Sequence, residues 1–290
     1  MAAALVVADG ADLMPGWCFY KMSGSGNDFI VFDALHDPVA AMNDPVVIAA
    51  LCARGTGVGA DGVVFMEPPS NEDDADLRMT YFNSDGSRAA MCGNAALCVT
   101  RLATDLGAGK RQGMRLETDS GILGARMAGA LPEVDMERVT DVRTSVEGIQ
   151  RESGERCIGF ALVGVPHLVV LRDSLDGLDV VERGRPLRMH PALRPAGANV
   201  NFVAPAPGKE GRWAIRTYER GVEGETLACG TGAIATAILL CAWGVAKGEV
   251  DLVTRSERPV LVRLRRDGSA WLPTIRAEGR LVFKGELADR

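Results

Sequence analysis

Residues 91–95 read Met-Cys-Gly-Asn-Ala, and residues 228–233 read Ala-Cys-Gly-Thr-Gly-Ala. Each segment places a cysteine directly before small turn residues, and the apolar, alanine-rich run that follows predicts a helix. A thiol at the start of a helix faces backbone N–H groups without intrahelical partners and the positive end of the helix dipole. This position favours the thiolate and can lower a cysteine pKa below its free value of about 8.5. Two such thiols, one in each half of the chain, suggest a two-base proton exchange.

The composition limits the class of protein. With 290 residues the chain suits two domains, each able to bury a core, and 47% hydrophobic and 24% charged residues are typical of a globular protein. A net charge of −6 argues against a nucleic-acid or anionic-membrane surface. No apolar run reaches about 18 residues, so no membrane-spanning helix is predicted. Seven cysteines, an odd number in a large chain, favour free thiols in a reducing cytoplasm.

Hydrophobic periodicity and turn signals predict many short strands and three helices, at 46–54, 92–106 and 231–243. The last two helices are apolar on most faces and must therefore be buried. We expect an α/β fold of α+β character with two similar domains related by a pseudo-twofold axis. Each domain would be a strand-rich sheet or barrel wrapped around one central helix.

The expected domain boundary lies at 131–133. The first domain would comprise residues 17–130 and 275–290 and carry Cys92, and the second would comprise residues 131–274 and carry Cys229. Residues 1–16 are expected to be a disordered extension.

The other motifs favour neither a metal nor a cofactor. The remaining cysteines are interpreted as small buried hydrophobic residues, since no C-x₂-C spacing supplies a zinc or redox site. Residues 57–62 match G-x-G-x-x-G, but they follow a helix and precede a strand, the reverse of the dinucleotide-binding order.

Several polar residues fall near the two cysteines along the chain. Glu219 and Arg220 end an alternating strand that leads toward Cys229, and arginine offers a planar fork for a carboxylate. Asn83 precedes Cys92 at a turn, and a histidine after a proline, His167, could poise a thiol as thiolate. Asparagines 27, 199 and 201, each considered alone, are interpreted as turn residues.

Taken in order, these motifs resemble the diaminopimelate epimerase family over nearly the whole chain from Phe19 onward. The resemblance rests on five stretches: residues 19–29 (FYKMSGSGNDF), 83–94 (NSDGSRAAMCGN), 166–167 (PH), 199–200 (NV) and 218–232 (YERGVEGETLACGTG). No single stretch is specific, but their order and combination are.

The resemblance implies a cofactor-independent amino acid epimerase, a homodimer, acting on LL-2,6-diaminopimelate and meso-2,6-diaminopimelate in lysine and peptidoglycan precursor synthesis. It implies an active site in the cleft between two similar domains, with Cys92 and Cys229 as the acid/base pair. His167 and Glu219 correspond to the residues that tune the thiols. The family's substrate contacts correspond to Asn27, Asn83, Gly93, Asn94, Asn199, Glu219, Arg220, Gly230 and Thr231.

The chain departs from the family pattern at three places. Val165 stands where asparagine often precedes Pro-His, Gly62 where some members have glutamine, and residues 95–97 (AAL) where Gly-x-Arg is usual. The first two concern the distal end of the substrate. They keep open a racemase of the same fold acting on another amino acid, such as a proline derivative or histidine. A different class, a redox protein whose two thiols form a reversible disulfide, also stays open.

Overall fold

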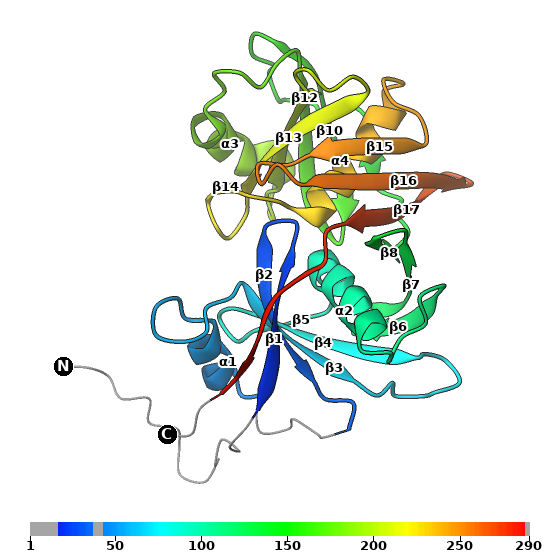
Figure 1. Cartoon of the computed structure of the whole chain (residues 1–290). Helices are drawn as coiled ribbons and strands as arrows, with labels where there is room; N and C mark the ends of the chain where they lie inside the picture. The colour runs from blue at the N-terminus through cyan, green and yellow to red at the C-terminus, as the bar shows by residue number, and fades with distance from the viewer. Residues whose placement is uncertain (1–16, 37–42, 288–290) are drawn as a thin grey trace, which may run out of the picture. The chain divides into compact units, whose positions relative to one another are not determined.

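A computed structural model describes residues 17–36 and 43–287, which form two compact units (Figure 1). The first unit contains the described residues up to Arg126 and from Gly279 onward, and the second is Met127–Glu278. The chain leaves the second unit after residue 278, not 274, because residues 275–277 end a strand that pairs within that unit. The extension expected at 1–16 lies outside the described residues.

The first unit is a sheet with a helix packed against each face. Its strands are β1 (Cys18–Gly24), β2 (Asn27–Asp33), β3 (Gly62–Glu67), β4 (Leu77–Asn83), β5 (Arg88–Ala89), β6 (Met114–Thr118), β7 (Gly121–Ala128) and β18 (Arg280–Glu286). Its helices are α1 (Pro45–Cys52) and α2 (Gly93–Asp105). The strand order is β18-β1-β2-β3-β4-β6-β7, with β5 also paired to β4.

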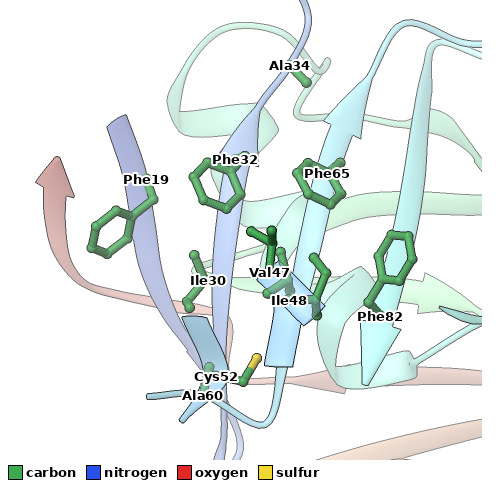
Figure 2. Packing of buried hydrophobic residues seen from close by; sticks show 11 residues of the cluster. Phe19, Ile30, Phe32, Ala34, Val47, Ile48, Cys52, Ala60, Phe65 and Phe82 are labelled. Atoms are coloured by element: carbon green, nitrogen blue, oxygen red, sulfur yellow. The ribbon is translucent and has the colours of Figure 1, made fainter. Parts of the chain in front are cut away.

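The helix α1 covers one face of this sheet through an aromatic core. Its start follows the sequence: the Asp44 side chain accepts a hydrogen bond from the Val46 amide, and proline occupies the first turn. Figure 2 shows the buried side chains of β1 to β4 and α1 that meet there, including Phe32 stacked on Phe65 at 5.5 Å. The other helix, α2, packs against β1, β2, β4 and β18.

The second unit has a longer sheet of the same kind. Its strands are β8 (Leu131–Asp135), β9 (Val142–Arg143), β10 (Glu155–Val163), β11 (Val165–Arg172), β12 (Asn199–Pro205), β13 (Arg212–Glu219), β14 (Gly224–Thr226), β15 (Glu249–Val253), β16 (Pro259–Asp267) and β17 (Ala270–Ala277). Its helices are α3 (Val180–Arg188), the 3₁₀ turn η2 (Pro191–Leu193) and α4 (Gly230–Ala242). The segment at 131–133 that was expected as the domain boundary is part of β8, which pairs with β17, and the first unit ends at Arg126.

The two units repeat one topology down to the pairing of single residues. In the first unit β1 and β2 are antiparallel, β2 and β3 are parallel, and β4 is antiparallel to both β3 and the short strand β5, after which α2 begins. In the second unit β10 to β14 pair in the same way, and α4 follows. Tyr81 pairs with Val64 and with Ala89, three residues before Cys92. In the second unit, Thr217 takes the same place, because it pairs with Asn201 and with Thr226, three residues before Cys229.

These registers make other positions equivalent as well. Phe29 pairs with Gly62 across the parallel strands of the first unit, and His167 pairs with Asn199 in the second. Phe29 and His167 therefore occupy equivalent places, as do Gly62 and Asn199. The repeated topology and the mixed composition of each unit confirm the expected α/β fold with two similar domains.

The two long helices are the buried centres of their units. Nearly every residue of α2 from Gly93 to Ala103 is buried, and so is α4 from Gly232 to Leu240. This confirms the inference that helices without a polar face are enclosed. No helix in the described part of the chain is both long and apolar enough to cross a membrane.

One helix, α3, was not predicted from the sequence. The Asp179 side chain caps it by accepting hydrogen bonds from two amides of its first turn, but Gly184 and Pro186 within it lower its helix propensity. Gly184 is required by packing, since a Cβ there would lie 2.6 Å from the Cβ of Tyr218.

Candidate functional site

Cys92 and Cys229 each stand at the N-cap of a central helix with nearly the same backbone. The φ and ψ angles are −139° and 117° at Cys92 and −139° and 109° at Cys229. Each cysteine carbonyl accepts a hydrogen bond from the amide four residues later, at 2.9 Å in both cases. Both thiols are therefore held at the positive end of a helix dipole, and both are only partly exposed.

In the first unit a chain of amides links the start of α2 to neighbouring segments. The Asn94 Nδ2 donates to the Asn27 Oδ1 at 2.7 Å, and the Asn27 Nδ2 donates to the Asp61 Oδ2 at 3.0 Å. The same Asp61 oxygen accepts from the Asp28 backbone amide at 3.1 Å. The structure thus brings together Asn27 and Asn94, two of the predicted substrate contacts, and adds Asp61, which has no recognisable signal in the sequence.

An ion cluster of Lys21, Asp28, Arg54 and Asp61 holds these segments in place. The buried Lys21 Nζ lies 2.6 Å from the Asp28 Oδ2 and donates to the Gly59 carbonyl, while Arg54 bridges Asp28 and Asp61 at 2.6 and 2.8 Å. Burial raises the pKa of Asp28, but hydrogen bonds from Arg54 and Lys21 outweigh it and hold that pKa below its usual value. The glycine-rich residues 57–61 therefore form an anchored loop between α1 and β3, which begins at Gly62.

Asn83 lies at the end of β4, and its side-chain NH₂ group is hydrogen-bonded within the turn that follows. Its Nδ2 donates to the Ser87 Oγ at 3.0 Å, and its backbone N–H donates to the Ser87 carbonyl at 2.9 Å. These contacts leave the side-chain carbonyl as the polar group that Asn83 can offer to a ligand.

In the second unit His167 is enclosed beside the start of α4. It is fully buried, and its Nδ1 lies 3.2 Å from the Asn201 Nδ2, which also donates to the Leu168 carbonyl at 3.2 Å. The Asn201 Oδ1 accepts from the Thr217 hydroxyl at 3.0 Å. Since Asn201 must present its NH₂ to Leu168, the His167 Nδ1 is an acceptor and the proton sits on Nε2. Burial, aided by the charge of Arg220, lowers the pKa of His167 to about 3, so the ring is neutral.

Asn201 also touches the first turn of α4. A Cβ on Gly232 would lie 2.3 Å from the Asn201 Oδ1 and 3.2 Å from the Cys229 Sγ. The interpretation of Asn199 and Asn201 as turn residues is wrong, because both lie buried within strand β12. Asn201 belongs to the surroundings of Cys229, and the parallel pairing of β11 with β12 puts it there.

The remaining predicted residues lie at the ends of the same elements. The Asn199 Oδ1 accepts from the Arg220 backbone amide at 2.7 Å, directly after Glu219 ends β13. The Thr231 Oγ1 lies 3.5 Å from the Cys229 Sγ. Gly93 and Gly230 are the first residues of α2 and α4. Within the described ranges no group of three or more His, Cys, Asp or Glu residues is arranged to hold a metal ion.

Two comparisons with solved structures agree with the fold. A PhzF-family phenazine biosynthesis protein from Bacillus anthracis superposes with a TM-score of 0.74 at 15% identity, covering 94% of this chain and 99% of its own. A hydroxyproline epimerase from Agrobacterium vitis, with bound trans-4-hydroxy-L-proline, superposes with a TM-score of 0.68 at 20% identity, covering 96% and 94%.

Sequence comparisons are more specific. The family model of diaminopimelate epimerase matches residues 19–142 and 159–272. A diaminopimelate epimerase of Gemmatimonas aurantiaca is 46% identical over 278 residues, covering 93% of this chain and 99% of the relative. That of Aquifex aeolicus is 37% identical over 281 residues, covering 93% and 98%. The chain therefore belongs to the diaminopimelate epimerase family and is an isomerase.

Proposed function

We propose that this protein interconverts LL-2,6-diaminopimelate and meso-2,6-diaminopimelate without a cofactor, a step that serves lysine and peptidoglycan precursor synthesis. Relatives named diaminopimelate epimerase that match nearly the whole chain support the substrate. The observation that carries the chemistry is the matched N-cap geometry of Cys92 and Cys229 in two units of one topology.

In the proposed reaction one cysteine, as thiolate, takes the α-proton of the substrate. The C–H bond breaks, an S–H bond forms, and the electron pair stays on the α-carbon and its carboxylate. The other cysteine, as thiol, then gives its proton to the opposite face of that carbon, which inverts the centre. Backbone N–H groups at the starts of α2 and α4 supply the donors that stabilise the carboxylate as charge builds on it.

His167 and Glu219 are proposed to tune the thiols. Because His167 is neutral and carries its proton on Nε2, it can act as a hydrogen-bond donor and not as a competing base. The Asn201 and Thr217 contacts hold it in that tautomer.

For substrate binding we propose Arg220 as the partner of the distal carboxylate. Its backbone is held by the Asn199 side chain at 2.7 Å, so Asn199 acts in part by orienting Arg220. Asn83 offers its carbonyl to the distal ammonium. The full proposed contact set is Asn27, Asn83, Gly93, Asn94, Asn199, Glu219, Arg220, Gly230 and Thr231.

A reaction in D₂O tests the function directly. At low conversion, LL-diaminopimelate should yield meso product that carries one deuterium at the inverted carbon, while recovered substrate stays protiated, because the donating thiol has exchanged with solvent. Cys92→Ala and Cys229→Ala should each abolish turnover, and Cys98→Ala serves as the matched control. Activity retained in either alanine variant, or turnover of proline derivatives or histidine in preference to diaminopimelate, would reject this assignment.

We also propose a cytoplasmic homodimer that forms through β18. The thiols must stay reduced to act, which fits a reducing compartment. Among the described strands β18 pairs only with β1, so its outer edge is open, and Leu281, Val282 and Phe283 on it are 44%, 45% and 46% exposed. Phe283→Lys should convert a dimer to a monomer in light scattering, whereas Val46→Lys, an exposed position on α1, should not. A wild-type monomer would refute this.

A further inference from the structure

Tyr81 is a buried phenol beside the Cys92 thiol that no role above uses. It lies on β4, is 7% exposed, and its ring meets that of Phe29 edge to face, with centroids 6.1 Å apart. Its hydroxyl is hydrogen-bonded with Cys92. Burial, followed by the charge of the Cys92 sulfur, raises the pKa of Tyr81 far above its ordinary value, so the phenol keeps its proton and remains a donor.

Gly62 makes the room that this ring occupies. It pairs with Asn83 across β3 and β4, so Tyr81 is its diagonal neighbour on the same face. A Cβ on Gly62 would lie 2.6 Å from the Tyr81 Cε2 and 3.0 Å from its hydroxyl oxygen. A side chain at position 62 would therefore clash with the Tyr81 ring, and also with the Phe82 carbonyl oxygen, which lies 2.5 Å from that Cβ.

The equivalent positions of the second unit are filled differently. Thr217 takes the place of Tyr81, and its hydroxyl donates a hydrogen bond to the Asn201 side chain. The Asn201 side chain in turn contacts His167. Phe29, which takes the place of His167, has no polar group to offer. In the second unit the buried polar side chain that reaches the start of α4 is Asn201, which contacts His167, whereas in the first unit Tyr81 contacts Cys92 itself.

We infer that Tyr81, given its room by Gly62, is a positioning residue for Cys92: its hydroxyl holds the sulfur and donates a hydrogen bond that stabilises the thiolate. The role rests on the proposed use of Cys92 as an acid/base group. When Cys92 is the base, the phenol stabilises its starting thiolate, and when Cys92 is the acid, the phenol stabilises the thiolate left behind.

The pH dependence of alkylation measures this contact without relying on turnover. Wild-type protein and Tyr81→Phe are treated briefly with iodoacetamide across a pH series. Modification is then quantified at Cys92 and Cys229 by peptide fragmentation, which separates Cys92 from Cys98 and Cys229 from Cys241. The Cys92 midpoint should rise by about one to two pH units in Tyr81→Phe, as expected when a charged acceptor loses one donor. The Cys229 midpoint should stay in place, and Tyr20→Phe should move neither.

A second variant tests the part played by Gly62. Gly62→Ala should raise the Cys92 midpoint in the same direction by displacing the ring, while Gly113→Ala, whose Cβ meets no atom within 4 Å, is the matched control. In turnover assays Tyr81→Phe should lower kcat and shift its pH profile upward with little change in KM.

The outcomes separate this inference from the proposed function. An unchanged Cys92 midpoint in Tyr81→Phe, or an equal shift at both cysteines, overturns the role of Tyr81 whatever the substrate is. Failure of wild-type protein to epimerise diaminopimelate rejects the proposed function but leaves the alkylation result to decide the Tyr81–Cys92 contact.

Discussion

Lowering the pH should weaken the second unit through one residue, His167. The pKa of this fully buried ring is lowered from 6.5 to about 3, so the unfolded chain binds a proton that the folded chain refuses. The contribution of His167 to the free energy of unfolding is therefore fully present above pH 6.5 and is lost as the pH falls from 6.5 toward 3. Between pH 7 and pH 4.5 this single group should remove about 2.5 kcal/mol of unfolding free energy.

The measurement compares urea unfolding of wild-type protein and His167→Gln at both pH values. Tryptophan fluorescence reports mainly on the second unit, where Trp213, Trp243 and Trp271 lie, because only the fourth tryptophan, Trp17, belongs to the first unit. Carboxylates such as Asp28 and Glu155, whose pKa values are also lowered, affect both proteins alike and cancel in the comparison.

Wild-type protein should lose about 2.5 kcal/mol more than His167→Gln on acidification. His36→Gln, a change in an exposed histidine, should behave as wild type. Equal losses in wild-type protein and His167→Gln would refute the claim that His167 is buried neutral.

Three further outcomes are expected. Arg220→Lys should lower kcat/KM on LL-diaminopimelate by an amount equal to about 2–4 kcal/mol of transition-state stabilisation, because an ammonium cannot bind a carboxylate through two parallel hydrogen bonds. Near-wild-type kinetics would contradict this. Lys21→Met should lower the unfolding free energy by about 2–4 kcal/mol in urea titrations, since Asp28 would lose a buried partner, and a loss below about 1 kcal/mol would count against the ion cluster as a stabilising feature. Dialysis against EDTA should leave turnover unchanged, and restoration by an added metal would overturn the cofactor-free proposal.

Patterns carried by consecutive residues were sufficient for the two cysteine-bearing helices. A run that is apolar on most faces predicts a buried helix, and a cysteine next to glycine marks its start. The same reasoning applied to both halves, so the duplicated α/β fold could be predicted before any pairing was known.

Features that depend on pairing between distant strands could not be predicted in this way. Asn201 reads as a turn residue locally, and only the pairing of β11 with β12 brings it to His167. Tyr81 reads as one apolar member of an alternating strand, and its closeness to Gly62 follows from the β3–β4 register. The helix α3 was not predicted because Gly184, which packing against Tyr218 requires, and Pro186 both lower its helix propensity.

The pairing of β18 with β1 has a consequence for synthesis on the ribosome. The second unit is continuous in the chain, so all its strands are available once Glu278 has emerged. The sheet of the first unit cannot be completed at that stage, because β1 begins at Cys18 but its partner strand β18 begins only at Arg280. We expect the nascent chain to hold an incomplete first sheet, with Phe19 lacking its ring contact with Phe283, until β18 has left the ribosome. A circular permutant that joins β18 directly to β1 would let the first unit finish before the second begins.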